Sequence, residues 1–274
     1  MSEFPDPALS VKALRYVACV SYPRSGHGLT ERVLRNYFQD QFTYCEFYKP
    51  DPQSCCKVFP CSKSGMTLSK NHDMGLKASA YSGIPKVDGV PYFVLYRNFL
   101  EAVVSEYERR LRLNHIKQDS KAEWKLVCKQ MLAYYRRFVK KWIFDPDPME
   151  RLLIRYEDLT EDPILTYTKV VEFFQPCDPV DRPRLQHIVE GARALSGTAM
   201  GVEYLPETRV RNRRVIEEFK YFDRSEFASL ERQLAHEFMQ LGYPLRYAEI
   251  SQVNSRSRFC LPGFSWFSRK RNGL

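Results

Sequence analysis

The ten residues SYPRSGHGLT, at positions 21–30, decide the fold of this chain. An apolar run, Tyr16–Tyr22, leads into them and has the composition of a buried β-strand. Apolar residues at helical spacing follow, namely Leu29, Val33, Leu34 and Phe38. A loop between a strand and the first turn of a helix is suited to an anion, because unpaired backbone N–H groups and the helix dipole both favour negative charge there.

The side chains of this loop are suited to a phosphate. Gly26 and Gly28 allow close approach of the backbone, and Arg24 carries a permanent positive charge. Ser25 and Thr30 offer hydroxyl donors. The loop lacks the first glycine and the Lys-Ser/Thr pair of a Walker A loop, which disfavours an ATPase or GTPase. An ordinary strand-to-helix turn is the alternative interpretation.

The rest of the chain alternates between strand-like and helix-like sequence patterns. Strand-sized apolar runs occur at 66–70, 91–96 and 151–156, and helical patterns at 100–111, 122–144, 163–174 and 223–242. This alternation is typical of βαβ units. We therefore predict a single α/β domain, residues 1–250, with a central parallel sheet of four or five strands flanked by helices in a P-loop-like architecture. A basic C-terminal tail, residues 251–274, would follow it.

Composition and charge narrow the possible partners. Hydrophobic residues make up 44% and charged residues 27%, as in a folded globular protein, and the net charge is +9. Such a charge suits nucleic acid, an anionic membrane surface or anionic small molecules and polymers, or serves solubility alone. The aromatic residues of the 122–144 helix recur at core spacing, so we expect no nucleic-acid partner. Peripheral membrane contact through Trp266 and Phe267 stays open.

No secretory or membrane segment is apparent. The first ten residues are polar, and no run approaches the roughly 20 apolar residues of a membrane helix. We expect a cytoplasmic enzyme. Among its eight cysteines, four cluster at Cys45, Cys55, Cys56 and Cys61. A zinc site and a redox pair are both conceivable, but the CxxC pairs of zinc sites are missing, so we expect reduced thiols and no metal.

A second phosphate contact is indicated further on. Arg97 ends a predicted buried strand, at the sheet edge where α/β proteins bind ligands, and a guanidinium pairs well with a phosphate. Ser105 follows on the next helix. The two motifs together resemble those of the sulfotransferase family. Residues 21–29 are similar to its 5'-phosphosulfate loop, YP[KR]SGTTWL, although His27, Gly28 and Leu29 depart from it. Residues 97–110 are similar to its RNPxDxxxSxYxxR segment, with Phe99 in place of the proline.

The resemblance implies further roles. The sequence LIRYEDL at 153–159 is similar to a family strand whose tyrosine packs near the donor adenine, here Tyr156. Lys70-Asn71-His72 resembles the family's KTH motif. Lys70 and Arg24 would then neutralise the leaving group, and His72 would take the acceptor's proton. His27 is a rival base, with Glu31 and Glu46 as weaker ones. Asp73 is a candidate to orient His72.

The C-terminal part of the resemblance rests on a basic stretch. Arg211, Asn212 and Arg213 could be the counterpart of the family's RKGxxGDW loop over the 3'-phosphate, or a solvated basic loop. The resemblance implies a donor, 3'-phosphoadenosine 5'-phosphosulfate (PAPS), with adenosine 3',5'-bisphosphate (PAP) as product. The acceptor would be a hydroxyl or amine of a small metabolite, carbohydrate or lipid. A P-loop nucleotide kinase or phosphotransferase and a non-catalytic nucleotide binder of the same fold are the alternatives.

Overall fold

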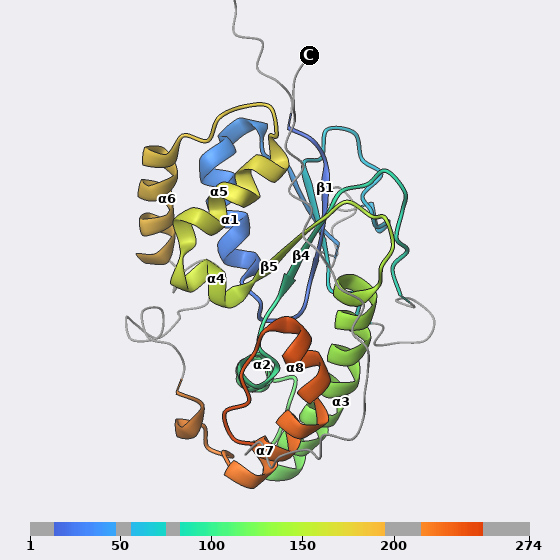
Figure 1. Cartoon of the computed structure of the whole chain (residues 1–274), viewed down its shortest axis with the longest axis vertical. Helices are drawn as coiled ribbons and strands as arrows, with labels where there is room; N and C mark the ends of the chain where they lie inside the picture. The colour runs from blue at the N-terminus through green and yellow to red at the C-terminus, as the bar shows by residue number, and fades with distance from the viewer. Residues whose placement is uncertain (1–13, 48–55, 75–82, 195–214, 249–274) are drawn as a thin grey trace, which may run out of the picture. The chain divides into compact units, whose positions relative to one another are not determined.

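A computed structural model describes residues 14–47, 56–74, 83–194 and 215–248 of the chain (Figure 1). The chain divides into two compact units, residues 1–223 and 224–274. The predicted tail, 251–274, lies outside the described residues. No helix among the described residues is long and apolar enough to cross a membrane.

The first unit is built on a five-stranded sheet in the order β2-β3-β1-β4-β5. The strands are β1 (Val17–Ser21), β2 (Tyr44–Glu46), β3 (Leu68–Asn71), β4 (Tyr92–Tyr96) and β5 (Arg151–Arg155), and every pairing is parallel. All residues of β1 and β4 are buried, as expected for central strands covered on both faces. The predicted parallel α/β fold is therefore confirmed.

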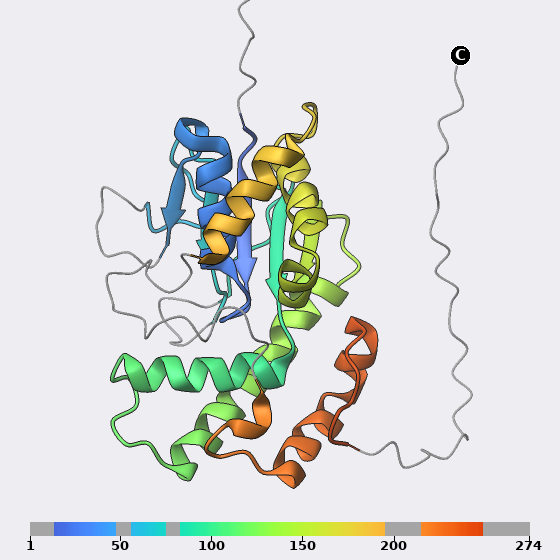
Figure 2. The same cartoon turned by 90° about the vertical axis from the view of Figure 1, so that its left-hand side faces the viewer.

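Helices cover the sheet. Helices α1 (His27–Phe38), α5 (Pro163–Phe174) and α6 (Arg182–Ala194) gather on one face, where their apolar residues form a core with β1, β4 and β5 (Figure 1). Helix α2 (Phe99–Arg112) lies crosswise beyond the strand tips (Figure 2). Short elements complete this unit: η1 (Gln39–Gln41), α4 (Tyr156–Glu161) and η3 (Ile216–Glu218).

Helix α3 (Lys121–Val139) begins at Ser120, whose hydroxyl accepts a hydrogen bond from the backbone N–H of Glu123. It continues into a π-helical turn, η2 (Lys140–Phe144), so the predicted helix 122–144 is two elements. Its aromatic residues are buried as predicted, among them Trp124, Tyr135 and Trp142.

Three differences from the sequence prediction matter. Strand β3 spans Leu68–Asn71, whereas we predicted 66–70, so the strand begins two residues later and includes Asn71. The predicted helix 223–242 is divided into α7 (Arg224–Gln233) and α8 (Ala235–Leu241). Strand β2 and helix α6 were not predicted, since β2 is only three residues long and α6 carries many charges.

The second unit contains α7, α8 and the residues up to Ala248. Glu231 is fully buried in it, and its carboxylate accepts hydrogen bonds of 2.7 Å from the backbone N–H groups of Arg246, Tyr247 and Ala248. A buried carboxylate satisfied in this way fastens the segment after α8 to α7.

Candidate active site

The site is built at the edge where the parallel strands end. The chain leaves β1 into the loop 22–26, β3 into His72, β4 into Arg97 and β5 into Tyr156. Because parallel strands present their carboxyl ends at one edge, four separate segments contribute to one surface.

The loop after β1 has the backbone of an anion-binding turn. Arg24 and Gly26 have positive φ angles of 67° and 87°, on either side of Ser25. Successive N–H groups in such a turn converge on a small anion. A Cβ at Gly26 would come within 2.9 Å of Tyr156 Cδ2 and 3.0 Å of Leu159 Cδ1, so both the conformation and the packing require glycine. A Cβ at Gly28 would meet nothing within 4 Å.

The other loop residues lie in the first turn of α1. The backbone N–H of Thr30 donates to the carbonyl of Gly26 at 3.0 Å, and its hydroxyl donates to the same oxygen at 3.2 Å. Leu29 is partly buried against the core behind the loop. The hydroxyl of Thr30 is thus turned toward its own helix end, whereas we had predicted that it could serve a phosphate.

Two arginines and a serine meet beside this loop. Arg24 Nε donates to Ser105 Oγ of α2 at 3.0 Å. Arg97 donates to the carbonyl of Arg24 at 3.2 Å and to Glu101 at 3.0 Å, and its guanidinium lies 4.0 Å from the ring centre of Tyr156. The structure thus brings together four predicted site residues. The sequence prediction gave Glu101 no role, because Arg97 lies before the N-cap of α2 and the helical i, i+4 rule does not cover this pair.

Two buried polar atoms of this cluster have no hydrogen-bond partner among the described residues: Ser25 Oγ and Arg97 Nε. Ser25 is 1% exposed and Arg97 is 7% exposed, so water does not readily replace the missing partners. Leaving a buried donor unsatisfied costs about 1–3 kcal/mol. Such a cost is explained if a ligand with acceptor oxygens completes the site.

His72 follows β3 and is held from one side. Its Nδ1 lies 2.7 Å from the carbonyl oxygen of Ser21 and 3.1 Å from the Ser21 hydroxyl. A carbonyl only accepts, so Nδ1 carries the proton and Nε2 carries the lone pair. Burial, with Lys70 nearby, lowers the pKa of His72 to about 3. The imidazole is therefore neutral at pH 7, with a lone pair on Nε2.

His27 is in a different situation. Its Nδ1 lies 3.3 Å from Cys19 Sγ and its Nε2 3.0 Å from the hydroxyl of Tyr44. Burial, and then Lys70 and His72, lower its pKa well below the usual range. Both ring nitrogens are engaged in the protein interior, so the side chain of His27 packs the loop against β1 and β2.

Lys70 lies on β3 opposite Cys19 of β1. Its Nζ is 3.7 Å from a carboxylate oxygen of Glu46, and its side chain is 13% exposed. Burial lowers the pKa of Lys70, and Glu46 opposes that shift. Glu46 thereby acts as the partner of a largely buried cation. Glu31 instead pairs with Arg35 at 2.6 Å on the surface of α1.

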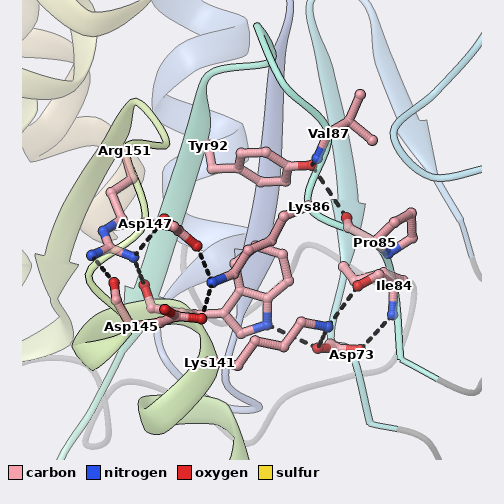
Figure 3. A network of polar contacts seen from close by, with 11 residues as sticks. Asp73, Ile84, Pro85, Lys86, Val87, Tyr92, Lys141, Asp145, Asp147 and Arg151 are labelled. Atoms are coloured by element: carbon pink, nitrogen blue, oxygen red, sulfur yellow. Dashed lines mark hydrogen bonds and ion pairs between the residues drawn. The ribbon is translucent and has the colours of Figure 1, made fainter.

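Asp73 does not orient His72. Its carboxylate accepts hydrogen bonds from Lys141 Nζ at 2.8 Å, from Trp142 Nε1 at 2.9 Å and from the backbone N–H of Ile84 at 2.7 Å (Figure 3). Figure 3 also shows Lys86 between Asp145 and Asp147. We call this set of contacts the Asp73 network. It fastens the segment after β3 to η2.

A shallow hollow lies on the side of the network toward α3. It is lined by Asp73, Gly83, Arg137, Phe138 and Lys141. Tyr134, also on α3, donates its hydroxyl to the carbonyl of His72. Sequence reasoning missed Tyr134, since nothing local links it to a residue so distant in the chain. Arg211, Asn212 and Arg213 lie outside the described residues.

Comparison with known proteins agrees with this geometry. Residues 17–191 match the sulfotransferase domain family, and the chain belongs to that family. It is accordingly a sulfotransferase, an enzyme that moves a sulfuryl group. Its fold is similar to that of mouse sulfotransferase SULT7A1, solved in complex with PAP: identity is 16%, the match covers 82% of this chain and 84% of that chain, and the TM-score is 0.55.

A second similar structure is the sulfotransferase domain from the curacin biosynthetic pathway. Identity is 14%, the match covers 85% of this chain and 99% of that chain, and the TM-score is 0.42. A comparison with curated protein sequences found no match.

Proposed function

We propose that this chain transfers a sulfuryl group from PAPS to a hydroxyl or amine of an acceptor and releases PAP. The observation that carries the proposal is the pair of buried donors, Ser25 Oγ and Arg97 Nε, without partners among the described residues. They adjoin a turn with two left-handed residues and a helix N-terminus, a combination that favours bound phosphate. The match of the family supports the same donor.

The donor's two phosphate ends would be held by separate segments. The 5' end would rest on the N–H groups of residues 25–29, with the side chains of Arg24 and Ser25. The 3'-phosphate would be held by Arg97 and Ser105, which already contact the Arg24 segment. The ring of Tyr156, under the Arg97 guanidinium, offers an edge for the adenine. Arg211, Asn212 and Arg213 are proposed to add charge over the 3'-phosphate.

Sulfuryl transfer requires one bond to form as another breaks. The acceptor oxygen or nitrogen attacks sulfur, and the bond between sulfur and the phosphate oxygen breaks. His72 Nε2, whose lone pair is fixed by the Nδ1–H bond to Ser21, takes the acceptor's proton. Lys70 and Arg24 meet the negative charge that builds on the departing phosphate oxygen. Lys70 is suited to this because it lies in a poorly solvated position.

The acceptor would approach His72 from the hollow lined by Asp73, the next residue along the chain. Arg137 and Lys141 line it, which favours an acceptor with an anionic group, such as an acidic sugar or a phosphorylated metabolite. The 1–250 span is the proposed catalytic region, and 251–274 the basic tail. A cytoplasmic location is part of the proposal.

Calorimetric titration with PAP, compared with ATP plus Mg²⁺, tests the donor site. We expect micromolar binding of PAP and weaker binding of ATP. Arg97→Lys keeps the charge but loses the planar fork, and should weaken PAP binding at least about tenfold. Arg35→Lys, in an exposed ion pair on α1, is the matched control and should leave it unchanged. Preference for ATP with Mg²⁺ would instead indicate a kinase.

A further inference from the structure

Three cysteine thiols converge at the β2 edge of the sheet. Cys45 lies in β2, and Cys56 and Cys61 lie in the connection from β2 to β3. Their sulfur atoms all lie within 4.8 Å of one another, and those of Cys56 and Cys61 are 3.3 Å apart. Cys55 lies outside the described residues. The remaining described cysteines, Cys19, Cys128 and Cys177, belong to no such group.

The spacing of these sulfur atoms suits a shared metal ion. A zinc–thiolate bond of about 2.3 Å with tetrahedral angles places two sulfur ligands about 3.8 Å apart. The separation of Cys56 and Cys61 is 3.3 Å and the other two are at most 4.8 Å, so small side-chain rotations suffice. A disulfide would use only two of the three thiols and would require sulfurs at about 2.05 Å.

The polypeptide around the thiols is held in place without a metal. Thr43 and Thr67 close the base of the connection with reciprocal hydrogen bonds of 2.7–2.9 Å between their hydroxyls and each other's backbone. The backbone N–H of Cys61 donates to the hydroxyl of Tyr16 at 2.7 Å, and that hydroxyl meets Ser69 Oγ. Ser69 is paired in register with Cys45. Contacts behind the ligands that fix their positions are a regular feature of metal sites.

We infer that Cys45, Cys56 and Cys61 form a site for a soft metal ion of the zinc class, with three thiolate ligands and the fourth position open to water. The geometry thus points to a metal that the cysteine spacing alone did not predict. Binding Zn²⁺ would release up to three protons, one from each thiol that is protonated beforehand.

The site lies one residue away from the proposed catalytic lysine. Cys45 pairs with Ser69 and Glu46 pairs with Lys70 along the two neighbouring strands. A metal bound at Cys45 would join the middle of the edge strand β2 to the connection that precedes β3. We expect it to stabilise this edge of the sheet, and the experiments below measure this without using turnover.

The test uses the full chain, reduced and freed of metal with a chelator, and titrated with Co²⁺. We expect one Co²⁺ per chain, with the intense visible bands of tetrahedral cobalt and a near-ultraviolet thiolate-to-metal charge-transfer band. Zn²⁺ should displace the cobalt and raise Tm by several degrees. Cys56→Ser and Cys61→Ser should each weaken Co²⁺ binding at least about tenfold, because each removes one thiolate ligand. Both residues are only partly buried, so we expect the variants to fold.

Two controls make the result decisive. Cys177→Ser, at an exposed cysteine, and Cys128→Ser, at a buried one on α3, should bind Co²⁺ as the unaltered chain does. Circular dichroism of each variant checks that it is folded. The inference is overturned if the reduced chain takes up no cobalt, or if the double variant of Cys56 and Cys61 still gives the charge-transfer band. It is also overturned if mass spectrometry finds a Cys56–Cys61 disulfide and no bound metal.

Discussion

The strand-end site and the Asp73 network are both rich in charge, yet they differ in how their polar groups are satisfied. In the network, Asp73 accepts three hydrogen bonds and Lys86 lies between two aspartates (Figure 3). At the strand ends, Ser25 Oγ and Arg97 Nε are buried and have no partner among the described residues. In the network, Asp147 Oδ1 also lacks a hydrogen-bond partner among the described residues, but it lies in an ion pair 3.6 Å from Arg151. The two unsatisfied atoms of the site are instead donors beside an anion-binding turn, for which we propose a phosphate ligand. Unsatisfied buried donors beside a turn with two positive φ angles, rather than charge alone, motivate the proposed ligand site.

The sharpest test of this comparison is His72→Ala. Loss of the general base should lower the rate of sulfuryl transfer by about 10²–10⁴-fold. PAP affinity should stay the same, because the imidazole contacts Ser21 rather than Arg97 or Ser105. Single-turnover assays with radiolabelled PAPS and an identified acceptor would measure the rate. His187→Ala, at an exposed position on α6, is the control. Unchanged turnover in His72→Ala would remove His72 from the proposed chemistry.

Next in size is Gly26→Ala. A positive φ and a Cβ 2.9 Å from the Tyr156 ring together should cost about 2–3 kcal/mol of unfolding free energy, and the displaced loop should bind PAP more weakly. Chemical denaturation and calorimetry measure the two effects. For the unfolding free energy alone, Gly28→Ala is a matched control two residues away, where a Cβ meets nothing within 4 Å. Equal losses in the two variants would contradict the packing argument.

The pH dependence of the unfolding free energy should differ between the strand-end site and the Asp73 network. The pKa of His72 is lowered to about 3 and that of His27 is also lowered, so the unfolded chain binds more protons below its ordinary histidine pKa of about 6.5. Stability is therefore fully present above about pH 6.5 and is lost as pH falls toward 3, by up to about 1.4 kcal/mol per pH unit for each histidine. Lys86 holds the pKa of Asp145 below its usual range, so the network resists acid over this window.

Thermal unfolding between pH 7.5 and 4.5 measures this dependence. His27→Gln should flatten the curve, since glutamine does not titrate. If stability were constant from pH 7 to 5 in the unaltered chain, neither histidine would be held neutral as the structure indicates.

The smallest expected effect is that of Lys86→Met. Loss of the bridge to Asp145 and Asp147 should cost about 1 kcal/mol, because these side chains are partly exposed. PAP affinity should not change. Urea unfolding and calorimetry check both statements, and a loss of PAP binding would show that the network takes part in the site.

Much of the fold was predictable from local signals. The continuous apolar runs of β1 and β4 and the proline at the start of α5 marked their elements closely. The divided helix α7–α8 was not predicted, because helical spacing continues across Leu234. Strand β2 escaped notice because three residues carry too little pattern.

Site residues that lie together in one segment of the sequence were predictable. Contacts between side chains from distant segments were not. The loop 21–30 and the Arg97–Ser105 pair were recognised from their order along the chain. The tautomer of His72, the double engagement of His27 and the contacts of Asp73 depend on residues far away in sequence. The convergence of Cys45 with Cys56 and Cys61 likewise follows from the position of β2 beside β3.

The order of the strands also has a consequence for synthesis. Strand β1 is made early, yet its partners are β3, which begins at Leu68, and β4, which begins at Tyr92. At roughly 5–20 residues per second, several seconds pass between translation of β1 and of β4. During that interval the apolar segment Val17–Ser21 has no complete sheet to enter, and the contacts of the anion loop with Ser105, Arg97 and Tyr156 still await residues not yet made. We therefore expect this apolar segment to be a chaperone-binding stretch of the nascent chain, because the central strand is translated before the strands that flank it.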